Sequence, residues 1–160
     1  MFVEFETDEI EQSIVARFVR QVERHGDRLA VKSAGRPLIY AEPDRAANRV
    51  ARDILDRHEM GPEIVALLLH KGVPLVIGLL GVLKAGKIYM LLDPAHPPAR
   101  LSYILEDTRA GHVVTGREHR GLAGTLARPE RWLDIDDVDA GSAAEPPPLA
   151  TRPDDLAHFL

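Results

Sequence analysis

The feature that most constrains the fold is an unbroken order of structural signals in the middle of the chain. Residues 74–83 begin with a proline and are otherwise apolar or glycine, Gly86 follows them, and residues 88–92 form a short apolar run. Proline is tolerated in the first turn of a helix, and glycine commonly ends one. This order predicts a helix, a glycine stop and a buried strand, with another helix opening at Pro98.

Similar signals recur along the chain. Helices are predicted at residues 10–25, 44–57, 74–83, 98–108 and 122–126, and strands at residues 29–33, 37–40, 64–69, 88–92, 112–115, 132–135 and 156–160. The run at 64–69 is apolar throughout, which is typical of a central parallel strand covered on both faces. The alternation of strands and helices predicts an α/β fold with a doubly wound, mostly parallel sheet and flanking helices. The first two strands are expected to form a separate small hairpin.

Composition narrows the class of protein. At 160 residues, with 45% hydrophobic and 28% charged residues, the chain is expected to form one globular domain. A net charge of −5 without a long basic run argues against nucleic acid or an anionic membrane as a partner. The longest apolar run, residues 73–83, has 11 residues, whereas a membrane span needs roughly 18. The lack of cysteine excludes disulfides and thiol nucleophiles, and together with an acidic N-terminus it favours a cytoplasmic location.

One segment resembles a phosphate-binding loop. Residues 81–87 fit the pattern G-x-x-x-x-G-K, but Ile88 stands where a magnesium-binding Ser or Thr is required. Such a loop leaves a strand and enters a helix, so that main-chain N–H groups face the anion. Residues 81–87 instead leave a predicted helix and enter a predicted strand. Gly86 is therefore interpreted as the end of a helix.

Other candidate sites are also incomplete. Residues 134–139 resemble the opening of a calcium loop, but Val138 occupies a ligand position, so a solvated acidic turn is favoured. The histidines include no pair with i, i+4 spacing, although His112 and His119 could meet in space. They stand at positions 25, 58, 70, 96, 112, 119 and 158, and the serines stand at positions 13, 33, 102 and 142, none of them in a G-x-S-x-G elbow. The sequence therefore predicts no catalytic, cofactor-binding or metal-binding residue.

Several segments resemble the core motifs of the adenylation domains of nonribosomal peptide synthetases, within the larger family of adenylate-forming enzymes. Residues 38–43 (LIYAEP), followed by 47–51, are similar to the first motif, L-[TS]-Y-x-E-L. Residues 82–94 (VLKAGKIYMLLDP), followed by 96–101 and 104–107, are similar to the second motif. Residues 154–157 (DDLA) are similar to the segment that leads into the third motif. Residues 10–14, Phe18 and 27–31 look like the entry helix and first strand of such a domain. The chain departs from these patterns at Ile39, Pro43, Leu91 and His158.

This resemblance implies the N-terminal part of an adenylate-forming enzyme fold, ending in mid-fold. Of residues 1–160, residues 10–135 would form the α/β layer, residues 136–153 an exposed proline-rich loop, and residues 154–160 the start of a strand leading to the phosphate loop. Members of the family use ATP and magnesium to make aminoacyl-AMP, and their phosphate loop, amino-acid pocket, ribose-binding aspartate and lid lysine lie downstream of the lead-in. The resemblance therefore implies a truncated fragment that binds no cofactor and is not catalytic by itself.

Two functions remain open on the sequence. The favoured one is the non-catalytic N-terminal portion of an amino-acid-activating adenylation domain, and the alternative is an autonomous interaction module that binds a partner or a complementary chain. The expected partner is the remaining part of an adenylation domain or a second copy, because the last strand should leave an apolar face and unpaired backbone groups exposed. Leu80 and Leu83 are expected to face the sheet, and Lys87 is expected to lie on the surface.

Overall fold

The computed structural model describes residues 10–32, 37–57, 61–138, 144–148 and 151–159. The helices are α1 (Ile14–His25), α2 (Ala41–Arg57), α3 (Val73–Lys84), α4 (Pro98–Asp107) and α5 (Arg120–Leu126), with 3₁₀ turns η2 (Arg117–His119) and η3 (Pro129–Arg131). The strands are β1 (Leu29–Val31), β2 (Leu38–Ile39), β3 (Ile64–Leu68), β4 (Ile88–Leu91), β5 (His112–Thr115), β6 (Trp132–Asp134) and β7 (His158–Phe159). Each predicted helix and strand is present, with bounds shifted by a few residues.

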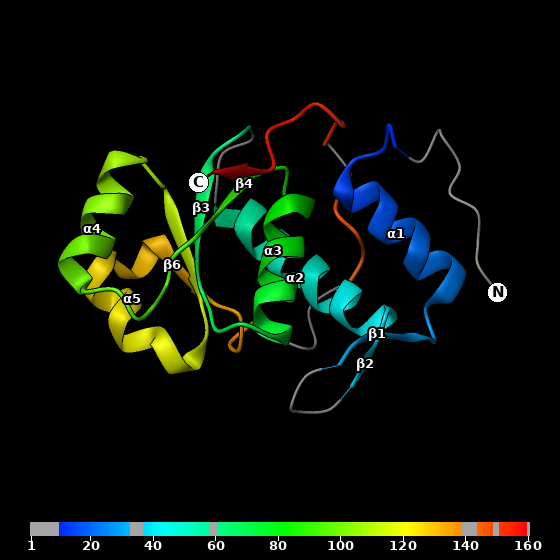
Figure 1. The fold of residues 1–160 in the computed structure, drawn as a ribbon, viewed down its shortest axis with the longest axis horizontal. Helices are drawn as coiled ribbons and strands as arrows, with labels where there is room; N and C mark the ends of the chain where they lie inside the picture. The colour runs from blue at the N-terminus through cyan, green and yellow to red at the C-terminus, as the bar shows by residue number, and fades with distance from the viewer. Residues whose placement is uncertain (1–9, 33–36, 58–60, 139–143, 149–150, 160) are drawn as a thin grey trace.

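A five-stranded parallel sheet in the order β6-β5-β3-β4-β7 forms the centre of the fold. β1 and β2 pair antiparallel in a separate hairpin. Figure 1 shows α4 and α5 on one side of the sheet and α2 and α3 on the other. The predicted α/β class, with a parallel sheet and flanking helices, is confirmed. None of the helices in the described ranges combines the length and the apolar character of a membrane span.

Alternate side chains of β3 belong to two separate cores. Leu67 packs in a cluster with Val82 of α3, on one face of the sheet. Leu68 packs on the other face, with Leu101 of α4 and Ala123 of α5. Because both faces of β3 are covered, the strand has no solvent side, and this accounts for its continuous apolar sequence.

Two local hydrogen bonds set the starts of the first two long helices. α1 begins at Ile14 rather than at residue 10 because the Ser13 hydroxyl accepts a bond of 3.1 Å from a main-chain N–H of the first turn. α2 begins a few residues earlier than predicted and carries Pro43 in its first turn, where the missing N–H costs little. The Glu42 carboxylate accepts a bond of 2.9 Å from the N–H of Ile39 just before the helix.

α3 ends as its glycine predicts. Gly86 has φ +68°, in the left-handed region that favours glycine. Its N–H donates to the carbonyl of Leu83 at 3.0 Å, and the N–H of Lys87 donates to the carbonyl of Val82 at 3.1 Å. These two bonds form a Schellman motif, which satisfies carbonyls at the end of the helix. The interpretation of Gly86 as a helix stop is confirmed.

α2 and α3 approach each other closely beside a buried ion pair. A Cβ atom at Gly81 would lie 2.5 Å from Cγ1 of Val50, so no larger residue fits there without movement. Nζ of Lys84 lies 2.5 Å from both Asp44 Oδ1 and Asn48 Oδ1. The Lys84 side chain is only 1% exposed, so these bonds link α3 to α2 in the interior of the protein.

Leu80 and Leu83 are buried, but not against the sheet. The residues of α3 in the sheet-side cluster include Val82, and at 3.6 residues per turn Leu80 projects from nearly the opposite side of the helix. Leu83 lines a cavity together with Val15 of α1. The prediction that both leucines face the sheet is wrong, because α1 packs on α3 and gives it a second buried side.

The segment 144–148 lies across α2. The side chains of Asn48 (Nδ2) and Arg52 (Nε) donate to main-chain carbonyls of this segment at 2.9 and 2.8 Å. Pro147 is buried. This part of the predicted exposed loop is therefore anchored on the helix, whereas residues 139–143 and 149–150 of the loop lie outside the described residues.

Candidate functional site

At the carboxyl ends of β3 and β5, the connections to the next strand lead to opposite sides of the sheet. β3 is followed by α3, which leads to β4 on one side, and β5 is followed by η2 and α5, which lead to β6 on the other side. α3 and α5 pack on opposite faces of the sheet. Open α/β sheets bind ligands at such a switch point, just outside the carboxyl ends of the strands. Side chains at this position are therefore the first candidates for a site.

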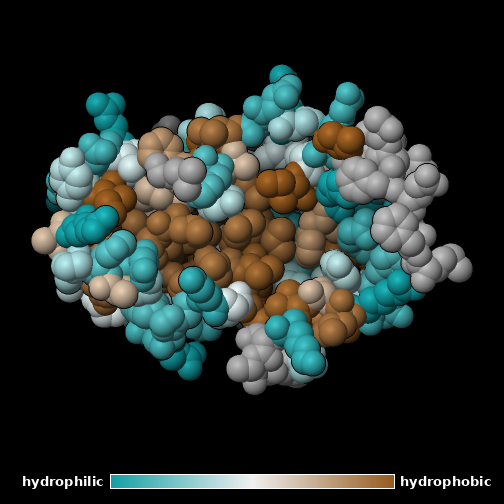
Figure 2. Space-filling view, viewed as in Figure 1, coloured by the Kyte–Doolittle hydropathy of each residue, from teal (hydrophilic) through white to brown (hydrophobic). Residues whose placement is uncertain are grey.

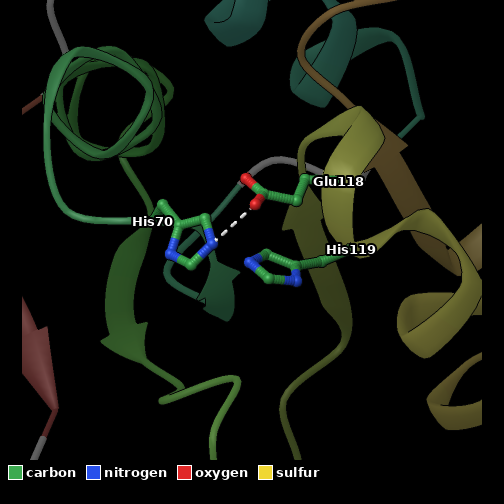
Figure 3. A group of neighbouring side chains, drawn as sticks. All are labelled: His70, Glu118 and His119. Atoms are coloured by element: carbon green, nitrogen blue, oxygen red, sulfur yellow. Dashed lines mark ion pairs between the residues drawn. The ribbon is translucent and has the colours of Figure 1, made fainter.

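Three polar side chains meet there (Figure 3). His70 follows β3, and Glu118 and His119 belong to η2, after β5. Nε2 of His70 lies 2.9 Å from Oε1 of Glu118, and the two imidazole rings have centroids 4.5 Å apart. One ligand atom from each residue lies within 4.8 Å of the other two. Within the described parts of the chain, this is the one group of three such side chains with spacing suited to a metal ion.

His119 is the more enclosed of the two histidines. Its Nε2 is buried and has no hydrogen-bond partner among the residues that the structure describes. Figure 3 shows a ring nitrogen of His119 directed toward His70 and Glu118. Both histidines line a cavity of about 710 Å³, whose wall includes Leu75 and Leu91. The His70 and Glu118 side chains are 55% and 67% exposed, which places the group at the mouth of this cavity.

Residues 81–87 do not form a phosphate-binding loop. They end α3 and enter β4, so no helix N-terminus follows them to face an anion. The expectation that Lys87 lies on the surface is wrong, since its side chain is 1% exposed and its Nζ lies 3.4 Å from Glu63 Oε2. Ile64 pairs with Ile88 in the sheet, so the residues before them, Glu63 and Lys87, are neighbours at the start of two parallel strands.

His112 joins this pair at the amino ends of the strands. Its Nδ1 lies 3.5 Å from Glu63 Oε1. Burial lowers the pKa of His112 below its ordinary value, although the nearby Glu63 carboxylate acts in the opposite direction. His112 begins β5 and His119 follows its end, so these two histidines do not meet. The group lies away from the carboxyl ends of the strands and holds the start of the sheet together.

Residues 134–138 form an acidic turn held by arginine. Nη2 of Arg120 lies 2.6 Å from both Asp134 Oδ2 and Asp137 Oδ2. The hydrogen bonds to Asp134, and then to Asp137, raise the pKa of Arg120. The carboxylate of Asp136 accepts a bond of 2.8 Å from the N–H of Arg117. Because these carboxylates already bind protein donors, the geometry favours a turn over a calcium loop, with Asp134 buried rather than solvated.

The other candidate residues are dispersed. His158 of β7 stacks on Tyr89 of β4, with ring centroids 4.5 Å apart and an interplanar angle of 12°. His25 ends α1, His96 follows the Asp-Pro corner after β4, and Ser102 lies within α4. His58, Ser33, Ser142 and Asp139 lie outside the described residues.

A second feature of the molecule is the open edge at β7. Among the described strands β7 pairs only with β4, so its outer side is unpaired there. Leu91, Leu156 and Phe159 are 48%, 60% and 37% exposed. Figure 2 shows apolar side chains gathered over α3 and the adjoining strands on the same face of the molecule. An apolar surface beside an open sheet edge is typical of a surface that another segment covers.

The group of His70, Glu118 and His119 was missed in the sequence because its members are far apart in the chain. The ends of β3 and β5 were predicted to within one residue, but nothing in the sequence places these two strands side by side. The one signal available in the sequence is that His70 follows the buried strand β3 closely, and that Glu118 and His119 follow β5 closely. That signal points to a site only once the order of the strands is known.

Comparisons with known proteins agree with one another. A family model described as AMP-binding enzyme matches residues 18–159. The chain is 36% identical over 143 residues to surfactin synthase subunit 2 of Bacillus subtilis (strain 168), covering 89% of this chain and 4% of that protein. It is 38% identical over 145 residues to surfactin synthase subunit 3 of the same organism, covering 89% and 11%. The crystal structure of the nonribosomal peptide synthetase FmoA3 in its AMPPNP-bound form matches with a TM-score of 0.85 and 28% identity, over 92% of this chain and 16% of that chain. The chain thus spans a small part of the relatives that it matches.

Proposed function

Because the chain belongs to the AMP-binding enzyme family, as an N-terminal portion of a nonribosomal peptide synthetase adenylation domain, we propose that it is the scaffold on which the amino-acid-activating site of such a domain is assembled. The complete domain would convert ATP and an amino acid to aminoacyl-AMP and pyrophosphate. In this proposal the 160 residues position the active site but do not hold the nucleotide or its magnesium ion.

The open edge of the sheet carries the proposal. Among the described strands β7 has no partner on its outer side, and the apolar side chains of Phe159, in β7, and of Leu156, just before it, lie exposed. A cavity of about 570 Å³ is lined by Ile14 of α1 and Leu156, with Leu83 at its wall. A further strand and its covering layer would remove these groups from water, and burial of apolar surface stabilises such an assembly.

The chemistry of the described residues supports a scaffold rather than a complete active site. Adenylate formation depends on charge stabilisation at the transferring phosphate and on alignment of the carboxylate. The segment that most resembles a phosphate loop, residues 81–87, ends a helix, and its Lys87 is buried against Glu63. The described residues thus offer no cradle for phosphate groups at that segment.

Exchange of labelled pyrophosphate into ATP tests this function. We expect the purified chain to give only background exchange across the common amino acids. Co-expression with the downstream part of a related adenylation domain should form a complex and restore measurable exchange. Robust exchange by the pure chain would overturn the scaffold proposal.

Two matched variants test the role of the edge. Phe159→Asp should weaken assembly with the downstream part, because it places a charge in β7 itself. Tyr103→Asp changes an aromatic residue of α4 that is 66% exposed, and should leave assembly unchanged. The second candidate function, an autonomous interaction module, uses the same exposed edge. It would be favoured if the chain bound other proteins through β7 but ignored the downstream part.

A further inference from the structure

At the switch point between β3 and β5 lies a buried polar atom whose lack of a partner the scaffold role does not explain. Nε2 of His119 is buried and lacks a hydrogen-bond partner within the described residues, whereas buried polar atoms are normally satisfied by protein, water or an ion. The pair between His70 and Glu118 does not involve this nitrogen. A further partner placed between the three side chains would satisfy it.

The three side chains indicate what kind of partner this is. Two imidazoles and one carboxylate form the ligand set of zinc sites that keep a fourth position open for water or substrate. Magnesium and calcium prefer oxygen ligands, so they fit this set poorly. We propose that His70, Glu118 and His119 bind a zinc ion, with an open coordination position beside the cavity that both histidines line.

The distances allow this with small side-chain movements. A tetrahedral zinc ion with bonds of about 2.0–2.1 Å holds its ligand atoms about 3.4 Å apart. Nε2 of His70 and Oε1 of Glu118 are 2.9 Å apart, and the ligand atom of His119 lies within 4.8 Å of its partners. The side chains of His70 and Glu118 are more than half exposed, so they can rotate without disturbing the core. The paired strands β3 and β5 hold the backbones on either side in register.

Metal titration of the full chain tests the site. The purified chain, freed of metal by dialysis against a chelator, is titrated with zinc in competition with a chromogenic zinc indicator. We expect one zinc ion per chain, and cobalt at the same site should give visible absorption bands of a tetrahedral complex. Excess magnesium should leave zinc binding unchanged.

Single substitutions separate this site from adventitious binding. His70→Gln, Glu118→Gln and His119→Gln should each lower the zinc affinity by more than about tenfold and remove the cobalt bands. His25→Gln on α1 and Glu106→Gln on α4 are the matched controls and should change neither, while far-UV circular dichroism checks that all variants are folded. Zinc binding that is absent, or that is equally strong in the three variants and the two controls, would overturn the proposal.

Discussion

Breaking the ion pair between α2 and α3 should strongly destabilise this layer. Lys84→Met keeps most of the length and the apolar character of the side chain's stem but removes its charge. The carboxylate of Asp44, with a side chain 16% exposed, and the amide oxygen of Asn48 would then lose their shared partner. Removing one member of a buried ion pair costs about 3–5 kcal/mol, and the partial exposure of Asp44 places the expected loss near the lower value.

Urea unfolding followed by circular dichroism at 222 nm measures this loss. With a dependence of about 2 kcal/mol per molar urea, a loss of about 3 kcal/mol lowers the unfolding midpoint by about 1.5 M. Lys71→Met, at an exposed lysine, is the matched control and should change the free energy of unfolding by no more than about 0.5 kcal/mol.

A double variant tests the cause. Adding Asp44→Asn to Lys84→Met removes the uncompensated charge, so the double variant should be more stable than Lys84→Met alone by about 1 kcal/mol or more. Equal midpoints for Lys84→Met and Lys71→Met would refute the reasoning that a buried charge joins the two helices.

Two further predictions concern the charged group at the amino ends of the strands. Lys87→Ala should lower the free energy of unfolding, measured in urea, by about 2 kcal/mol, because it removes a buried apolar stem and takes this cation away from Glu63. A loss as small as that caused by Lys71→Ala would contradict this prediction. Burial lowers the pKa of His112 in the folded chain below the value of about 6.5 that it has in the unfolded chain. The folded chain therefore binds a proton at His112 less readily than the unfolded chain does. The resulting stability is complete above about pH 6.5 and is lost as the pH falls through the lowered pKa of the folded chain. The urea midpoint should therefore fall on acidification below about pH 6.5, and less steeply in His112→Gln; equal slopes for the two proteins would contradict this origin.

Local signals in the sequence predict most of the fold. Pro98 and Gly86 act on their own backbone or on the adjacent turn, so their effects follow from residue type and position alone. The strand at 64–69 was recognised because burial on both faces removes every polar residue from it. The class of fold then followed from the order of the elements.

The buried positions of Lys84 and Lys87 could not be predicted from the sequence, for one physical reason. Lysine is almost always exposed, and only a particular tertiary partner reverses this default. Asp44 stands 40 residues before Lys84, on a different helix, and Glu63 precedes a different strand from Lys87. Neither pairing is therefore visible until the packing of α2 on α3 and the register of β3 with β4 are known. The grouping of His70 with His119 likewise depends on the order of strands, which local signals do not determine.

The segment that resembles a phosphate loop shows why spacing alone misleads. Its pattern has two glycines and a lysine, and each has a packing reason at this place in the fold. Gly81 lets α2 approach, Gly86 supplies the left-handed turn that ends α3, and Lys87 binds Glu63 across the starts of two strands. In a phosphate loop the same residue types serve a helix that begins, where free N–H groups attract an anion. Here they lie at the end of a helix, where the groups without an α-helical partner are carbonyls, and carbonyls do not attract an anion. The direction in which the chain passes between helix and strand, rather than the residues themselves, therefore decides between nucleotide binding and packing.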